Sequence, residues 1–201
     1  VHAQRKLGHW YLEGTAGVAR DPAEALEWYL KAAEQGDVYS QHNVAYLNEH
    51  GHDGQGDADD IPRDHDEAAK WYRRAAEDHA HAASARQMGH LIADDAIAGD
   101  EAEAARYYAI AAEKGDPEAS TALGLLYYDG KGGLPRDRRK AIELWLKAAK
   151  KGDEGAHFSD FITAGVNHIT FEAEDTHGHT SSSTVAGGVS AGSGGAADDS
   201  L

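Results

Sequence analysis

The strongest constraint on the fold of this 201-residue chain is an internal repeat. One block of alanines and large apolar residues occurs four times, first as Ala25, Trp28, Tyr29, Ala32 and Ala33, and then at the same offsets from Ala68, Ala104 and Ala141. A second block precedes each of them and carries Leu7-Gly8, Val44-Ala45, Met88-Gly89 and Leu123-Gly124. The units start near residues 3, 40, 84 and 119, with a partial start at 156, so each has room for two helices. The sequence therefore predicts a stacked array of helix pairs.

The first of these blocks has the spacing of a single buried helix face. Its apolar positions fall at i, i+3, i+4, i+7 and i+8, which lie on one side of an α-helix. The alanines let a neighbouring helix come close, and the two larger residues fill the wider gap at the other end of the contact. We therefore interpret the aromatic residues as core, not as the lining of a ligand site.

Capping residues mark the helix ends. Asp21 precedes Pro22 and lies three residues before Glu24, and Asp64, Asp100 and Asp116 also stand where helices should begin. Glycines that can adopt a left-handed conformation follow the last periodic residues, at Gly14, Gly36, Gly51, Gly115, Gly130 and Gly152. These signals predict helices near residues 2–13, 22–35, 38–50, 66–79, 83–97, 101–114, 117–129, 138–151 and 154–163.

The order of fixed positions from Ala3 to Asp37, Ala-x3-Leu-Gly-x2-Tyr-x2-Gly followed by Ala-x2-Trp-Tyr-x2-Ala-Ala-x2-Gly-Asp, closely resembles the Sel-one-like repeat (SLR), a relative of the tetratricopeptide repeat. The resemblance covers about 155 of the 201 residues. It implies an all-α, right-handed α/α superhelix, or solenoid, of about four helix-turn-helix repeats, near 3–39, 40–83, 84–118 and 119–155. A partial C-terminal capping helix over 156–164 would complete a solenoid spanning 1–164. Members of this family hold other proteins together, as adaptors in bacterial signalling, envelope and host-interaction systems and in the degradation machinery of the eukaryotic endoplasmic reticulum.

The chain departs from the family pattern in three places. The second unit has Ala45 where the family has glycine, His79 where the closing glycine would stand, and one extra residue before Ser84. We expect these changes to alter the junction between the second and third units. The third unit has a shortened turn between Asp95 and Gly99. Beyond the array, residues 165–201 predict a low-complexity, mostly disordered Gly/Ser/Ala tail, in which 166–172 forms either a short strand or a segment packed on the last helix.

Composition excludes several classes of function. With 35 Asp and Glu against 19 Lys and Arg, the net charge of -16 argues against nucleic acid and anionic membranes as partners. No apolar run is long enough for a membrane helix, so we expect no membrane insertion in this segment. The absence of cysteine excludes disulfides, thiolate metal sites and a cysteine nucleophile. No catalytic motif is present either, so the sequence predicts a non-enzymatic protein without a cofactor.

The predicted partner site lies on the first helix of each unit. Once the shared structural positions are set aside, a ridge at i, i+4 and i+7 remains, and successive units should place it side by side. Its candidate partner-binding residues are Arg5, His9, His42, Tyr46, Arg86, His90, Leu125 and Tyr128. We expect this ridge to line a concave groove that accepts a peptide or helix with carboxylates, which guanidinium groups bind in a bidentate manner. The competing interpretation is that half of these residues pack against the neighbouring unit.

Two alternatives remain open. The His/Asp-rich insertion over 50–65 offers His50, His52, Asp53 and Asp57 as ligands for zinc, nickel or manganese in a metal- or ligand-binding module, although a solvated acidic loop is the simpler explanation. The chain could also be a fragment of an adaptor in a protein-degradation or signalling complex. It begins at Val1 and its only methionine is Met88, so we expect a processed or truncated piece. The sequence predicts neither its compartment nor its oligomeric state.

Overall fold

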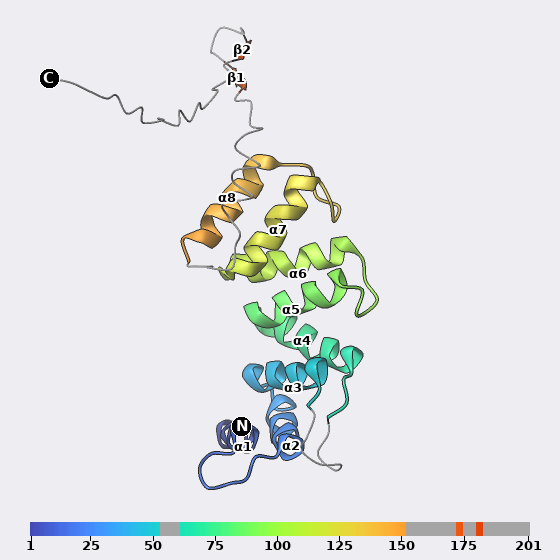
Figure 1. The fold of residues 1–201 in the computed structure, drawn as a ribbon, viewed down its shortest axis with the longest axis vertical. Helices are drawn as coiled ribbons and strands as arrows, with labels where there is room; N and C mark the ends of the chain where they lie inside the picture. Colours follow the sequence, from blue (N-terminus) through green and yellow to red (C-terminus); the bar gives the residue numbers. More distant parts are fainter. Residues whose placement is uncertain (53–60, 152–171, 175–179, 183–201) are drawn as a thin grey trace, which may run out of the picture. The chain divides into compact units, whose positions relative to one another are not determined.

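The computed structural model describes residues 1–52, 61–151, 172–174 and 180–182. The chain divides into two compact units, Val1–Ala156 and His157–Leu201. The described part of the first unit contains eight α-helices (Figure 1): α1 His2–Glu13, α2 Pro22–Ala33, α3 Val38–His50, α4 His65–His79, α5 Ala82–Ala93, α6 Glu101–Glu113, α7 Pro117–Asp129 and α8 Arg138–Ala149. Eight of the nine predicted helices are thereby confirmed. The ninth, over 154–163, lies outside the described residues.

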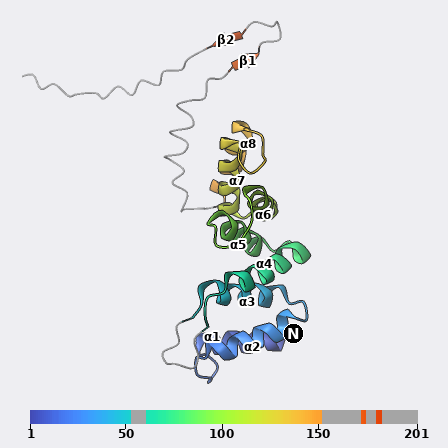
Figure 2. The ribbon, with the colours of Figure 1, turned by 90° about the vertical axis from the view of Figure 1, so that its right-hand side faces the viewer.

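The helices of the first unit pack in chain order. Odd-numbered and even-numbered helices pair as α1–α2, α3–α4, α5–α6 and α7–α8, and each even-numbered helix also packs on the odd-numbered helix that follows it. The successive pairs form a stack that can be followed from α1 to α8 (Figures 1 and 2). The fold is the all-α repeat superhelix that the sequence predicts.

The predicted capping residues begin the helices. The side chain of Asp21 accepts a hydrogen bond from the backbone N–H of Glu24 at 2.8 Å, and Asp64, Asp100 and Asp116 cap α4, α6 and α7 in the same way. The Glu24 carboxylate does not return to the cap and instead accepts a bond from the indole N–H of Trp28 at 2.9 Å. Each cap satisfies a backbone donor that the first turn of a helix leaves unpaired.

The core consists of two clusters. The smaller one joins Ala25, Tyr29 and Ala33 of α2 to Val44 and Leu47 of α3 and also contains Ile61, and the larger one extends from α3 to α8. Trp71 packs against both clusters and so connects them. The aromatic residues singled out as core are buried at Tyr29, Tyr72, Tyr107, Tyr108 and Trp145, and Trp28 and Trp71 are half-buried. Their interpretation as core is confirmed except for Trp28, which is half-buried and belongs to neither cluster.

The boundary predicted for α5 is wrong by four residues. The sequence pattern continues to 97, but the helix ends at Ala93, and Asp95 adopts a positive φ of 56°. The backbone N–H groups of Ala96 and Ile97 both turn back to the carbonyl of Leu91, at 2.9 and 3.2 Å. Ile97 packs against the core from this turn. In the sequence, an apolar residue at this spacing therefore looks like a continuation of the helix.

Part of the C-terminal unit is also described. Strands β1 (Glu172–Glu174) and β2 (Thr180–Ser182) pair antiparallel, with Ala173 opposite Ser181. The sequence predicts neither strand at these bounds, since its candidate strand over 166–172 shares only Glu172 with β1. The expected capping helix over 156–164 and the expected segment 166–171 lie outside the described residues, as does most of the tail over 165–201.

Candidate protein-interaction surface

The two arginines of the predicted ridge lie in junctions between consecutive odd-numbered helices. Arg5 of α1 donates from Nη1 to Oδ1 of Asp37 at 2.7 Å, and Asp37 is the residue that caps α3. The Arg5 guanidinium also lies 5.1 Å from the centre of the Tyr39 ring. The Arg5 side chain is therefore held inside the array, with 28% of its surface exposed.

Arg86 repeats this arrangement two units further along. Its Nε lies 3.6 Å from Oδ2 of Asp116, which caps α7, and its Nη1 pairs with the carboxylate of Glu118. The Arg86 side chain is 21% exposed. Both guanidinium groups have intramolecular carboxylate partners, so the geometry favours a role in joining helix pairs for these two ridge residues and gives no support to a partner with carboxylates.

His42 occupies the equivalent position in the second pair. Its Nδ1 lies 3.0 Å from the hydroxyl of Ser84 in α5, and its ring lies 5.1 Å from that of His81, which caps α5. Burial lowers the pKa of His42 to about 4, and the positive charges of His81 and Arg86 act in the same direction. This imidazole is neutral at physiological pH and, like the two arginines, belongs to a junction.

The remaining ridge residues differ in exposure. His9 and Tyr46 are exposed, and Tyr46 stacks on His50 with 4.2 Å between the ring centres. His90 is half-buried, with Nδ1 3.1 Å from the Tyr108 hydroxyl. Leu125 and Tyr128 are half-buried too, and the Tyr128 ring lies between Trp145 and the guanidinium of Arg138. Among the eight candidates, only His9 and Tyr46 are exposed.

Sequence reasoning missed a third exposed aromatic residue on this side. Tyr39 is 58% exposed and Tyr46 is 48% exposed, and they lie seven residues apart on the same face of α3. The corresponding positions of α1 are His2 and His9, both exposed. A comparison of each helix start across the units could have identified Tyr39, because the other units have His2, Ala83 and Glu118 there. We call Tyr39, Tyr46, His2 and His9 the Tyr/His surface.

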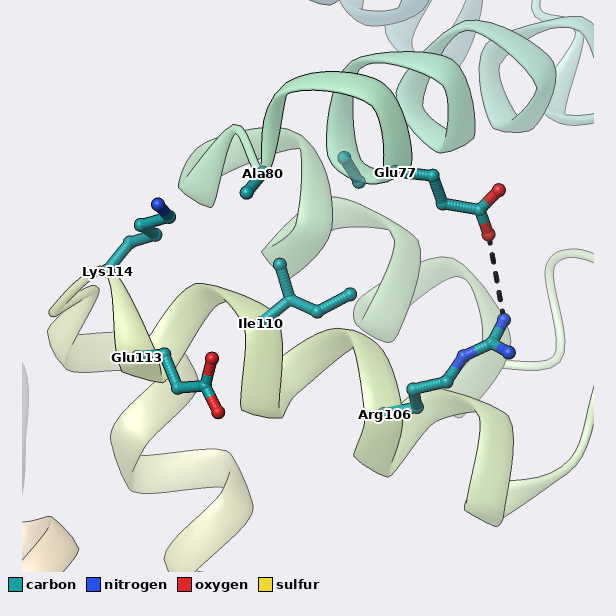
Figure 3. A pocket seen from close by; sticks show the side chains of 7 residues that line it. Glu77, Ala80, Arg106, Ile110, Glu113 and Lys114 are labelled. Carbon is teal, nitrogen blue, oxygen red and sulfur yellow. Dashed lines mark ion pairs between the residues drawn. The ribbon is translucent and has the colours of Figure 1, made fainter.

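The even-numbered helices bear a separate feature, a pocket of about 610 Å³ between α4 and α6. Ala76, Glu77 and Ala80 line it from α4 and its C-terminal end, and Arg106, Ile110, Glu113 and Lys114 line it from α6. In Figure 3, Ile110 points toward α4 beside the ion pair between Glu77 and Arg106, whose charged atoms are 3.7 Å apart. The pocket lies at the C-terminal end of α4, which has 15 residues, against 12 in α2.

The described part of the metal candidate does not form a metal centre. His50 lies with Nδ1 3.1 Å from the Tyr46 carbonyl, and His52 Nε2 accepts from the Arg20 guanidinium at 2.7 Å. Asp53 and Asp57 lie outside the described residues. Among the residues that are described, no group of three or more His, Asp or Glu side chains could hold a metal ion.

None of the helices described is long and apolar enough to cross a membrane.

Paired helices stacked through a nearest-neighbour core define a helical-repeat solenoid. Comparison with known families identifies the repeat: the Sel1 repeat matches residues 1–37, 38–78, 82–116 and 117–153, and the chain belongs to this family. The four units begin about two residues earlier than the sequence boundaries predicted here. Sel1 repeat proteins typically serve as non-enzymatic scaffolds for protein–protein interactions.

A solved structure of the same family agrees with this assignment. A Sel1 repeat protein from Oxalobacter formigenes is 36% identical, with a TM-score of 0.66 over 76% of this chain and 59% of that chain. The chain thus spans about six tenths of the length of that relative. Weaker similarity links it to c5321, a protective antigen of uropathogenic Escherichia coli with an SLR fold (24% identity, TM-score 0.48, 80% of this chain and 41% of that chain). Immunity protein Pa5087 of Pseudomonas aeruginosa is similar at 25% identity and a TM-score of 0.46, over 73% of this chain and 54% of that chain.

Proposed function

We propose that this chain is a non-enzymatic scaffold that binds a peptide segment of another protein along its odd-numbered helices, with the Tyr/His surface as the central contact. The observation that carries the proposal is the pair of exposed tyrosines on α3, Tyr39 and Tyr46. Tyrosine contributes a large rigid contact area and a hydroxyl, which makes it a frequent anchor in protein interfaces. We propose that the first helices of the units line the concave side of the solenoid.

The chemistry of the surface defines the kind of partner. Phenol and imidazole groups can donate and accept hydrogen bonds, and their rings cover apolar side chains. Arg5 and Arg86 already have intramolecular carboxylate partners, so the surface offers few free cations. The partner segment we propose therefore has apolar and hydrogen-bonding side chains, and acidic residues contribute less than the sequence pattern suggests.

Paired affinity captures test this proposal. Wild-type chain, a Tyr39→Ala/Tyr46→Ala variant and a Leu146→Ala variant are each used as bait, and captured proteins are compared by quantitative mass spectrometry. Leu146 is the matched control, because it is a 47% exposed apolar residue on α8, an even-numbered helix. Proteins lost by the tyrosine variant and kept by the control are the expected result. Equal retention by all three baits, with unchanged circular dichroism, would contradict the proposal.

A further inference from the structure

Three junctions join consecutive odd-numbered helices at the same repeat position, and the middle one differs in chemistry. Between α1 and α3 the junction pairs Arg5 with the cap Asp37, and between α5 and α7 it pairs Arg86 with the cap Asp116. Between α3 and α5 the same two positions are His42 and the cap His81. Two imidazoles thus replace a guanidinium and a carboxylate.

The hydrogen bonds at the middle junction fix which nitrogens carry protons. Nδ1 of His81 accepts from the backbone N–H of Ser84 at 3.4 Å as the cap of α5, so this nitrogen carries no proton. It also lies 2.9 Å from the Ser84 hydroxyl, which must then be the donor in that contact. The hydroxyl therefore accepts from Nδ1–H of His42 at 3.0 Å. The chain of bonds from His42 through Ser84 to His81 requires a neutral His81.

Among the described residues, neither imidazole has a carboxylate as a direct partner. The groups around the pair are Tyr39 of α3, 5.8 Å from His81 between ring centres, Tyr72 of α4, 5.4 Å from His42, and the positively charged Arg86 of α5, with His79 at the end of α4. The nearby carboxylates pair with other groups: Asp116 and Glu118 with Arg86, and Glu49 with the Tyr72 hydroxyl. In the described part of the chain, the contacts of the two rings include no charged residue of α2. A proton on either ring would therefore add a positive charge that has no carboxylate partner of its own.

We propose that the junction between α3 and α5 is an acid-labile hinge of the array, which opens when His81 and His42 take up protons while the two Arg–Asp junctions stay closed. A proton on Nδ1 of His81 removes both bonds that this atom accepts and places a positive charge at the N-terminus of α5, which the helix dipole disfavours. A proton on His42 leaves its bond to Ser84 intact but creates a half-buried cation beside Arg86. The two other junctions pair a guanidinium with a carboxylate in place of two imidazoles.

The direction of the pH dependence follows from linkage. Burial lowers the pKa of His42 to about 4 in the folded chain, against an ordinary 6.5, and burial followed by the charge of His79 lowers the pKa of His81. The folded form therefore binds fewer protons than the open form below pH 6.5, and its stability falls as the pH decreases from 6.5 toward 4. For His42 alone, lowering the pH from 7.5 to 5.0 favours opening by on the order of 30-fold.

Amide hydrogen exchange of the full chain tests the hinge. Protection factors are measured at pH 7.5 and 5.0 and corrected for the pH dependence of intrinsic exchange. We expect the amides in the first turn of α5 to lose protection at least tenfold, while those of α3 and α7, capped by Asp37 and Asp116, change less than threefold. Unchanged protection in α5, or an equal loss at all three helix starts, would overturn the proposal.

The repeat itself supplies the matched variant. The double substitution His42→Arg and His81→Asp gives the middle junction the residues of its two neighbours, and we expect it to abolish the difference between pH 7.5 and 5.0 in α5. A double variant that keeps the wild-type difference would contradict the role of these histidines. If it does not fold, His81→Asp alone serves instead, since it changes only the cap, and it should reduce the pH effect at least threefold. An imidazole titration by NMR that gives ordinary pKa values for both histidines would also refute the hinge.

Discussion

In three of the four described helix pairs, a glycine and the aromatic ring that covers it set the distance between the two helices. A Cβ atom added at Gly8 would lie 2.8 Å from the ring of Tyr29, and one added at Gly89 would lie 2.5 Å from the ring of Tyr108. Gly124 has the same relation to Trp145 in the fourth pair. These distances are shorter than van der Waals contact, so the absence of a side chain lets the two helices approach. The second pair has Ala45 at this position and still buries Tyr72 completely.

This contact predicts the effect of a single methyl group. Gly89→Ala should lower the free energy of unfolding by about 1–3 kcal/mol, because the methyl group overpacks the contact with Tyr108. The loss should appear even though alanine is favoured over glycine in a helix by about 1 kcal/mol. Urea denaturation followed by circular dichroism measures the difference. In a Tyr108→Leu background the same change should cost less, and an equal cost in both backgrounds would show that the ring is not the obstacle.

At the scale of the element, the aspartates that cap helices have two different roles. Asp100 caps α6 by accepting from the N–H of Glu103 at 2.7 Å and is exposed. Asp116 caps α7 through the N–H of Ala119 at 2.9 Å, but it also lies beside Arg86 and its side chain is only 13% exposed. The first aspartate stabilises a single helix, and the second also joins two helix pairs.

The two roles predict unequal costs. Asp100→Ala should remove about 1 kcal/mol of stability, the typical value of an N-cap. Asp116→Ala should cost about 2–3 kcal/mol, because it additionally leaves the half-buried Arg86 with only the exposed Glu118 as a carboxylate partner. Chemical denaturation of both variants and of the Arg86→Ala/Asp116→Ala double variant measures the coupling between the two side chains. Equal losses for the two aspartates would mean that the junction contributes nothing beyond the cap.

At the scale of the whole molecule, the sequence predicts the features that recur in every unit. It does not predict how neighbouring units pack against each other. The helices, their aspartate caps and the buried aromatic positions follow from short-range patterns, so they could be assigned residue by residue. The partners of Arg5 and Arg86 could not be assigned in this way, because they depend on how one unit is rotated relative to the next. When each helix is considered alone, both side chains look unpaired. The pocket beside Ile110 has the same origin. Its lining residues belong to two different units, α4 and α6, so the space between them appears only once both helices are placed.

Nearest-neighbour packing predicts that a core substitution destabilises mainly the helices next to it. Tyr29 is 1% exposed and belongs to the cluster formed by α2, α3 and Ile61, which meets the rest of the core through Trp71. Tyr29→Ala should cost about 3–5 kcal/mol through the cavity that it leaves. In a solenoid, where each unit contacts only its neighbours, the loss should fray α1 and α2 first.

Hydrogen exchange with peptide-level resolution measures how far this loss spreads. We expect amides of α1 and α2 to lose protection in the Tyr29→Ala variant, while those of α6, α7 and α8 keep it. Tyr108→Ala is the matched control, since the side chain of Tyr108 is 4% exposed and lies in the larger cluster, where its loss should affect the helices on both sides. A uniform decrease in all eight described helices of the Tyr29→Ala variant would show that the array unfolds as one unit, which nearest-neighbour packing does not allow.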